Sequence, residues 1–136
     1  MPRLSKAAAQ ERKARIVALA EKRFVQNGYE QTTVDEIVKE IGLAKGTYYY
    51  HFDSKEDLMI AVSEKLILET STKLNAVYNR RDKDIVWRIR NVLKTYQDDF
   101  YRNKGIWRQV YHWRNAMLYH RVAHISAQRF TPILED

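Results

Sequence analysis

Apolar residues recur at helical spacing along most of this chain, and this pattern predicts a succession of α-helices. The first stripe predicts a helix over about residues 7–27 and consists of Ile16, Leu19, Ala20, Phe24 and Val25. Asn27 and Gly28 stand at its end, and both are residue types that commonly cap a helix C-terminus. Only four glycines and two prolines interrupt the 136 residues, which favours long helices. We therefore expect an all-α fold.

The next segment predicts two short helices joined by a sharp turn. Thr33 and Glu36 have the spacing of a capping box at the start of the first helix. The apolar face of this helix consists of Val34, Ile37, Val38 and Ile41. Gly42 follows, and glycine adopts the left-handed conformation at a helix end without the cost of a Cβ. A helix, a glycine turn and a second helix are typical of the helix-turn-helix of DNA-binding proteins.

The second helix of this pair is expected over about 45–51 and carries side chains suited to DNA. We expect Tyr50 and Phe52 to point to the core, and the outward side to present Lys45, Gly46, Thr47, Tyr48 and Tyr49. A lysine can donate to guanine, a threonine methyl can contact the thymine methyl, and a glycine lets the helix approach the bases closely. Tyrosines can pack on thymine methyls or reach phosphates with their hydroxyls. The sequence therefore predicts a major-groove recognition helix.

These residues resemble the DNA-binding domain of the TetR family of bacterial transcriptional regulators. The resemblance extends from about Ile16 to about Val62, with its most specific part in the run Gly46-Thr47-Tyr48-Tyr49-Tyr50-His51-Phe52 followed by Lys55. It implies base contacts from Lys45, Gly46, Thr47 and Tyr49, and phosphate contacts from Thr33, Tyr48, His51 and Lys55. Ala44 departs from the family pattern because it offers no capping side chain, and beyond residue 70 the resemblance is one of pattern and length only.

Four further helices are predicted after the recognition helix. Ser54 is a suitable N-cap for the first, and the four are expected over about 55–78, 84–103, 106–117 and 119–136, with Pro132 as a kink or boundary in the last. We expect a DNA-binding domain over 1–54, begun by a frayed basic arm at 1–6, and a regulatory domain over 55–136. The apolar pattern still runs at the last residues, and the resemblance implies two more helices that form the dimer interface. We therefore expect an incomplete regulatory domain.

Aromatic residues gather in the second half of the chain, and they predict either a ligand pocket or a packed helical core. A ligand pocket is usually apolar with a few polar groups. The resemblance implies that these helices enclose a small-molecule effector, and the nearby Arg and His residues indicate an anionic or aromatic one. The candidate effector-binding residues are Tyr96, Phe100, Trp107, Tyr111 and Met117.

Composition and charge narrow the choice of function. The net charge is +7, with ten Lys and Arg against seven Asp and Glu in the first 55 residues and fourteen against ten in the rest. Such a chain attracts polyanions, although the charge also serves solubility. The absence of cysteine fits a reducing cytoplasm, and we expect no signal peptide, membrane span, cofactor or metal site. His120 and His124 are four residues apart, but no carboxylate nearby completes a metal site.

The preferred hypothesis is a transcriptional regulator, most simply a repressor. It would bind palindromic double-stranded operator DNA as a homodimer and be released by a small-molecule effector. No nucleophile and base pair, glycine-rich phosphate loop or paired carboxylates support an enzyme. A DNA-binding protein without sequence preference and a regulator controlled by a protein partner remain the alternatives.

Overall fold

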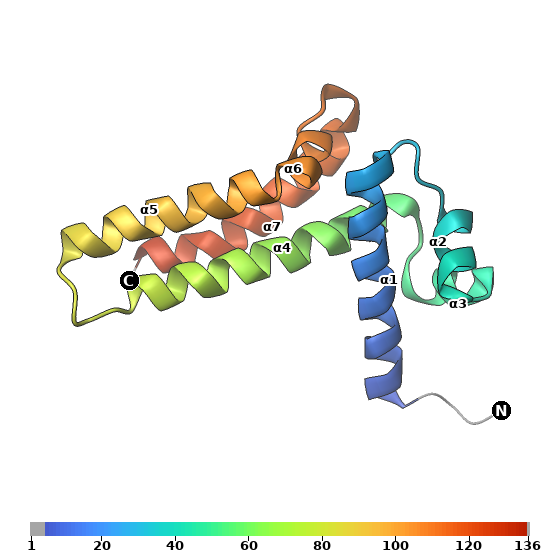
Figure 1. Ribbon diagram of the computed structural model, residues 1–136, viewed down its shortest axis with the longest axis horizontal. Coiled ribbons are helices and arrows are strands. Elements are labelled where there is room, and N and C mark those ends of the chain that lie inside the picture. The colour runs from blue at the N-terminus through green and yellow to red at the C-terminus, as the bar shows by residue number, and fades with distance from the viewer. Residues whose placement is uncertain (1–4, 136) are drawn as a thin grey trace. The chain divides into compact units, whose positions relative to one another are not determined.

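The computed structural model describes residues 5–135, except for the side chains of residues 113 and 134. The described part is all-α, as predicted, and Figure 1 shows its helices in order. They are α1 (Lys6–Asn27), α2 (Val34–Ile41), α3 (Lys45–His51), α4 (Lys55–Tyr78), α5 (Ile85–Arg102), α6 (Lys104–Val110), a 3₁₀ turn η1 (Trp113–Asn115) and α7 (Ala116–Glu135). Most of the arm expected at 1–6 and the last residue of the helix expected to end at 136 lie outside the described residues.

The chain divides into two compact units, Met1–Val62 and Ser63–Asp136. The division falls within α4, whereas the sequence pattern predicts a domain boundary at the start of this helix. Helix α4 therefore contributes its first turns to the N-terminal unit and the rest of its length to the C-terminal unit.

The N-terminal unit forms around the apolar faces of α1, α2, α3 and the start of α4. Its fully enclosed side chains are Ile16, Ala20, Phe24, Ile37, Tyr48, Leu58, Met59 and Val62. The buried hydroxyl of Thr32 donates to the backbone oxygen of Gly28 at 2.8 Å, so this polar group is satisfied. Ile16, Ala20 and Phe24 belong to the stripe that the sequence pattern predicts, because residues three and four apart share one face of a helix.

In the N-terminal unit, capping residues mark where helices begin and end. In the predicted capping box, Thr33 Oγ1 accepts from Glu36 N at 3.2 Å and Glu36 Oε2 accepts from Thr33 N at 3.3 Å. Gly42 ends α2 in the predicted left-handed conformation, with φ of +80°. Ala44 makes no side-chain capping bond to α3. Ser5 caps the start of α1, and its hydroxyl accepts from Ala8 N at 3.1 Å.

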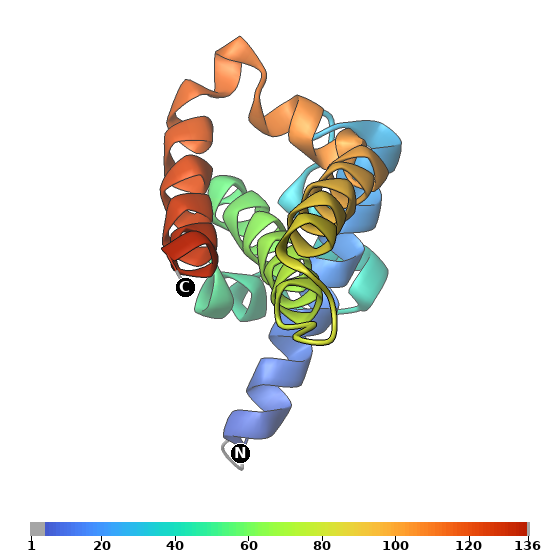
Figure 2. The same cartoon turned by 90° about the vertical axis from the view of Figure 1, so that its left-hand side faces the viewer.

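In the C-terminal unit, α4, α5 and α7 run alongside one another, with α6 near one end (Figures 1 and 2). Asp99 on α5 is 4% exposed and links α5 to α4. Its carboxylate accepts from Thr70 Oγ1 at 3.1 Å and from Lys73 Nζ at 2.9 and 3.0 Å. Arg102 lies 3.4 Å away on the same helix. A buried carboxylate of this kind is retained only with hydrogen bonds and opposite charge.

The prediction of a single helix over 106–117 is wrong. Helix α6 ends at Val110, η1 follows, and α7 begins at Ala116. Side chains here bind the backbone: His112 Nδ1 accepts from Arg114 N at 3.3 Å, and Asn115 Nδ2 donates to Gln109 O at 2.8 Å. Such local bonds compete with a continuous helix. Helix α7, in contrast, continues past Pro132, so this proline does not mark a boundary.

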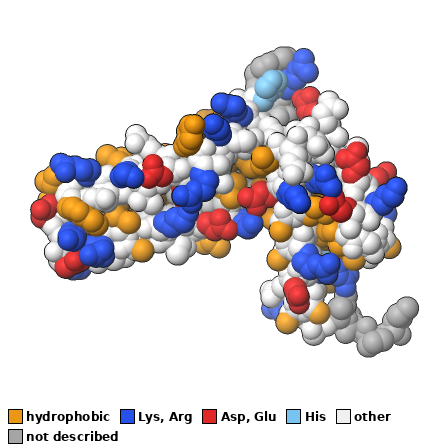
Figure 3. All heavy atoms as spheres, in the orientation of Figure 1, with side chains coloured by type: hydrophobic (Ala, Val, Ile, Leu, Met, Phe, Trp, Pro, Cys, Tyr) orange, Lys and Arg blue, Asp and Glu red, His pale blue; other side chains and the backbone are white. Residues whose placement is uncertain are grey.

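Apolar side chains remain on the surface of α5. Ile85, Val86, Ile89 and Leu93 are 49–59% exposed, although the sequence pattern places Ile85 and Ile89 on one apolar face. Figure 3 shows hydrophobic side chains interspersed with Lys and Arg over this unit. Among the described residues, no helix combines the length and apolar character needed to cross a bilayer.

Candidate nucleic-acid interface and ligand cavity

The exposed face of α3 presents the side chains expected for DNA recognition. Lys45 and Gly46 are exposed in its first turn, Thr47 is half-buried, and Tyr49 is 46% exposed. The turn at Gly42 positions α3 directly after the capped α2 (Figure 1). Apart from its chain neighbours and the nearby backbone of α3, no atom lies within 4 Å of a Cβ built at Gly46, so the surface there is open to a partner.

The predicted orientations of two tyrosines are wrong. Tyr48 is fully buried, with its hydroxyl donating to Ser54 O at 2.8 Å, and Tyr50 is 77% exposed. Burial raises the pKa of Tyr48, which keeps the phenol protonated. The reason is helical geometry: Tyr48 and Phe52 are four positions apart and share a face, whereas two positions separate Tyr50 from Phe52. The side chain of Tyr48 is therefore a core group and is not available to DNA.

Lys45 is held by an acidic side chain on the neighbouring helix. Its Nζ lies 2.9 Å from Asp35 Oδ1, and both side chains are exposed. The hydrogen bond to Asp35 raises the pKa of Lys45 and keeps it charged. Sequence reasoning did not single out Asp35, although an acid in the first turn of a helix is common because it favours the positive end of the helix dipole.

The residues expected at phosphates have different environments. Thr33 is exposed and uses its hydroxyl to cap α2. Lys55 is half-buried: its Nζ donates to Tyr29 O at 2.8 Å and lies 4.4 Å from the Tyr29 ring centroid, and burial lowers its pKa. His51 is half-buried as well. Its Nε2 atom is enclosed without a hydrogen-bond partner among the described residues, and burial followed by the charges of Arg12 and Lys13 lowers its pKa.

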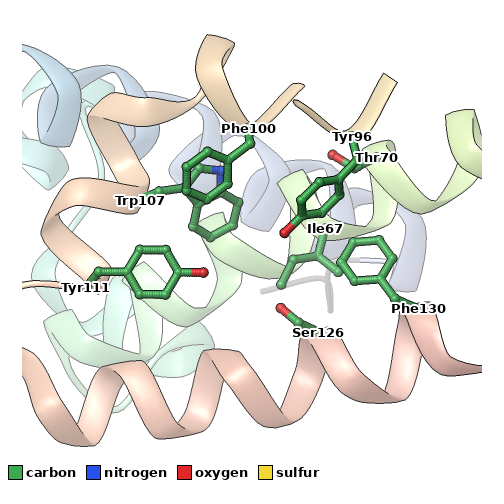
Figure 4. Close-up of a pocket in the computed structure, with 8 residues that line it drawn as sticks. All are labelled: Ile67, Thr70, Tyr96, Phe100, Trp107, Tyr111, Ser126 and Phe130. Carbon is green, nitrogen blue, oxygen red and sulfur yellow. The ribbon is translucent and has the colours of Figure 1, made fainter. Parts of the chain in front are cut away.

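A cavity in the C-terminal unit brings together four of the five predicted effector-binding residues. We name it the aromatic cavity, and its volume is about 30 Å³. Its lining residues come from α4, α5, α6 and α7 and the turn after α6 (Figure 4): Ile67, Thr70, Tyr96, Phe100, Trp107, Tyr111, Ser126 and Phe130. The Phe100 and Trp107 rings stack at 6.3 Å with an interplanar angle of 7°. Met117 is 71% exposed and does not line the cavity, contrary to expectation.

A second cavity lies beside the first, and we name it the aliphatic cavity. Its volume is about 280 Å³, and it is lined by Leu74, Val92, Leu93, Tyr96, Phe130 and Ile133. Tyr96 and Phe130 line both cavities and meet edge to face, with ring centroids 5.9 Å apart and an interplanar angle of 87°. This aromatic pair therefore forms the partition between the two spaces.

The polar side-chain groups of the residues that line the aromatic cavity are four hydroxyls and the indole N–H of Trp107. Figure 4 shows the hydroxyls of Tyr96, Tyr111 and Ser126 pointing inward, and none of the three has a hydrogen-bond partner among the described residues. Burial raises the pKa of Tyr111, so this phenol is neutral and can donate. The sequence did not single out Thr70 or Ser126 for this site, because their residue types are common on any helix surface.

The residues of the candidate DNA interface match a known protein family. Residues 16–62 match the profile of the family described as bacterial regulatory proteins, tetR family. The uncharacterized HTH-type transcriptional regulator YerO of Bacillus subtilis is 36% identical over 67 residues, which are 49% of this chain and 23% of that protein. The HTH-type transcriptional regulator QacR of Staphylococcus aureus is 27% identical over 109 residues, with 69% of this chain and 58% of QacR covered.

A solved structure extends the similarity beyond the helix-turn-helix. It is a TetR-family transcriptional regulator from Pectobacterium atrosepticum, with a TM-score of 0.62 and 28% identity, and the match covers 71% of this chain and 50% of that one. The chain thus spans less than two thirds of the length of these three relatives. The matched profile, these relatives and the capped α2, glycine turn and exposed α3 together assign residues 16–62 to the TetR family of bacterial regulatory proteins.

Proposed function

We propose that this chain is a ligand-responsive transcriptional regulator, acting as a repressor. In this proposal it binds palindromic operator DNA as a homodimer and is released by a small-molecule effector. The observation that carries the DNA-binding part is the exposed face of α3, which presents Lys45, Gly46 and Tyr49 after a sharp glycine turn. Both curated relatives named above are described as transcriptional regulators, which supports the same assignment.

The DNA contacts proposed for this interface follow from exposure. Lys45, Gly46, Thr47 and Tyr49 contact base edges in the major groove. Thr33 and His51 remain proposed phosphate contacts. Lys55 keeps this role only if its ammonium gives up the carbonyl oxygens of Tyr29 and Glu30, which lie at 2.8 and 3.5 Å.

The proposed effector site comprises the aromatic and aliphatic cavities. A ligand there would contact α4, α5, α6 and α7, and α4 continues into the N-terminal unit. Release of DNA requires that the effector bind the DNA-incompetent conformation more tightly than the competent one. The candidate residues for this contact are Tyr96, Phe100, Trp107 and Tyr111.

The test is selection of bound duplexes from a random DNA library, with Tyr49→Ala as the interface variant. Tyr101→Ala is the matched control, because Tyr101 is an exposed tyrosine of the C-terminal unit. The expected result is an inverted repeat that is lost with Tyr49→Ala and kept with Tyr101→Ala. A single enriched half-site would contradict the homodimer. Binding without enrichment that fades as salt rises would replace the proposal with sequence-independent DNA binding.

A further inference from the structure

The two cavities form a path along one side of the C-terminal unit. Ile67, Thr70 and Leu74 lie three and four positions apart on α4, so they share one face of that helix. The distance from Ile67 to Leu74 along the axis is roughly 10 Å at about 1.5 Å per residue. On α7 the lining residues Ser126, Phe130 and Ile133 have the same kind of spacing. The lining of the two cavities therefore extends over roughly 10 Å along α4.

The aromatic cavity is too small to hold an effector alone, and the aliphatic cavity gives room only for a small one. The aromatic cavity of about 30 Å³ holds little more than one water molecule. The aliphatic cavity, at about 280 Å³, is at the small end for a ligand site. Tyr96 and Phe130 separate them, and Tyr96 is 42% exposed with no hydrogen bond from its hydroxyl to the described residues. Rotation of this pair would join the two spaces.

The walls offer no formal charge to a ligand. No Asp, Glu, Lys, Arg or His lines either cavity in the described part of the chain. The nearby buried acid, Asp99, is already bound by Lys73 and by the hydroxyl of Thr70. Because Thr70 uses its hydrogen in that bond, it can only accept from a ligand. A charged group entering this space would lose its hydration without gaining an opposite charge, which is strongly unfavourable.

We propose that the effector is an uncharged, elongated, mostly apolar molecule that spans both cavities. Its apolar body lies among Leu74, Val92, Leu93 and Ile133, and its polar end meets the inward hydroxyls of Tyr96, Tyr111 and Ser126. A hydroxyl or carbonyl group is the matching polar end, because these three hydroxyls can each donate and accept. This inference deepens the ligand-responsive function proposed above and rests on it. It favours a different class from the anionic or aromatic effector that the nearby Arg and His residues suggest.

The first experiment compares three amphiphiles with the same chain and different head charge: decanol, decanoate and decyltrimethylammonium. Each competes with the neutral fluorophore 1-aminoanthracene for the full chain at neutral pH, without DNA. Decanol is expected to displace the fluorophore at least about tenfold more effectively than either charged compound. Equal or better displacement by a charged amphiphile would overturn the proposal, and so would failure of all three to compete.

One pair of variants tests the apolar end of the site. Leu93 and Val86 lie on the same helix and are both 59% exposed, but only Leu93 lines the aliphatic cavity. Leu93→Trp is expected to weaken decanol binding at least about fivefold by filling the cavity, and Val86→Trp to leave it unchanged. Equal effects from the two variants would place the ligand outside the aliphatic cavity.

A second pair of variants tests the polar end. Ser126→Leu should also weaken decanol binding at least about fivefold, because the larger side chain fills the aromatic cavity and removes a hydroxyl from it. Thr131→Leu is the matched control, since Thr131 is an exposed hydroxyl residue of the same helix and does not line either cavity. Unchanged binding with Ser126→Leu would contradict a ligand that spans both cavities.

Release of operator DNA is measured separately. If decanol binds and DNA stays bound, the ligand class stands and the ligand-responsive function fails. If a charged compound releases DNA and competes at this site, the function stands and the ligand class is wrong. If no probe binds and Leu93→Trp lowers self-association in sedimentation, the aliphatic cavity belongs to an interface between copies of this chain, which also overturns the proposal.

Discussion

The side chain of Lys45 is restrained by an ion pair in the free protein. In the free protein its ammonium is bound to Asp35, so DNA must compete with a carboxylate for the same group. Asp35→Asn is expected to tighten operator binding about two- to fivefold, because it frees the ammonium and removes a negative charge near the phosphates. Fluorescence anisotropy at several salt concentrations would measure this change.

The matched control for that prediction is Asp82→Asn. Asp82 forms a comparable exposed pair with Arg80 at 2.8 Å, but it lies in the C-terminal unit between α4 and α5. The same loss of charge there should change operator affinity much less. Equal effects from the two variants would mean that net charge, and not the release of Lys45, explains the result.

His51 gives the N-terminal unit a pH dependence with a defined sign. Burial lowers its pKa below the ordinary 6.5, with Arg12 and Lys13 adding to the effect. The unfolded chain therefore takes up the proton at higher pH than the folded protein, so the contribution to stability is complete above pH 6.5 and declines as pH falls through the folded pKa. Urea unfolding between pH 5 and 8 should show a shallower decline for His51→Asn than for the native chain. His120→Asn, at an exposed histidine, should keep the native slope if His51 is responsible.

At the scale of single residues, the sequence predicted some environments well and others badly. The gathering of aromatic residues in the second half of the chain indicated a common cluster, and Tyr96, Phe100, Trp107 and Tyr111 line one cavity. The predicted buried and exposed environments of Tyr48 and Tyr50 were exchanged, because a helix of seven residues is too short to show an apolar stripe by itself. The separation of Tyr48 from Phe52 would have identified the buried tyrosine.

At the scale of elements, two glycines close together should respond oppositely to alanine. Gly42 has φ of +80°, where a Cβ is strained even though the surrounding space is open. Gly42→Ala is therefore expected to cost about 1–2 kcal/mol of unfolding free energy. Gly46 is a helical residue of α3 with open space, so Gly46→Ala should stabilise the fold by up to about 1 kcal/mol.

Operator binding separates the functional from the structural role of Gly46. If α3 approaches the bases there, the added methyl of Gly46→Ala weakens operator binding although the fold is more stable. Chemical denaturation and DNA titration of the same samples would show both changes. A stabilised variant with native operator affinity would exclude close approach at this position.

The buried carboxylate of Asp99 connects two elements that the sequence pattern could not pair. Asp99→Ala is expected to destabilise the fold by about 1–3 kcal/mol, since Thr70 and Lys73 lose their acceptor while the part-exposed Lys73 can still turn to water. Asp98→Ala is the control, because its pairing with Lys94 is exposed. Thermal or urea unfolding should show little change for Asp98→Ala, and similar losses for the two variants would contradict a specific role of Asp99.

Helix boundaries were predictable where a cap defines them and not where other local side-chain bonds to the backbone interrupt the helix. The capping box at Thr33 and the turn at Gly42 each depend on residues close together in the sequence, and both occur as expected. The break after Val110 depends on side-chain bonds from His112 and Asn115 to the backbone, which no periodicity reveals. Because that break starts α7 at Ala116, Met117 falls in the first turn of α7 and outside the cavity. The prediction that Met117 lines the cavity was therefore wrong for the same reason as the predicted helix boundary.

At the scale of the whole molecule, α4 is the one helix shared by the two compact units of the described chain. If an effector lowers operator affinity by a given factor, linkage requires that the operator lower effector affinity by the same factor, in the usual range of about 5–150. A glycine in an exposed helical position raises the cost of keeping the helix regular by about 1 kcal/mol. The position of such a glycine along α4 should therefore determine whether coupling or only stability is affected.

Glu64 and Asn75 provide this comparison, because both are exposed on α4 and only Glu64 is next to the division between the units. Glu64→Gly is expected to reduce the coupling factor toward one while each separate affinity changes little. Asn75→Gly, beyond the cavity residue Leu74, should keep the native factor at a similar cost in stability. Operator titrations with and without saturating decanol, and the reverse titrations, would give the factor in both directions. Native coupling in Glu64→Gly would mean that the signal does not depend on an unbroken α4, and the mechanism proposed for DNA release would have to be replaced.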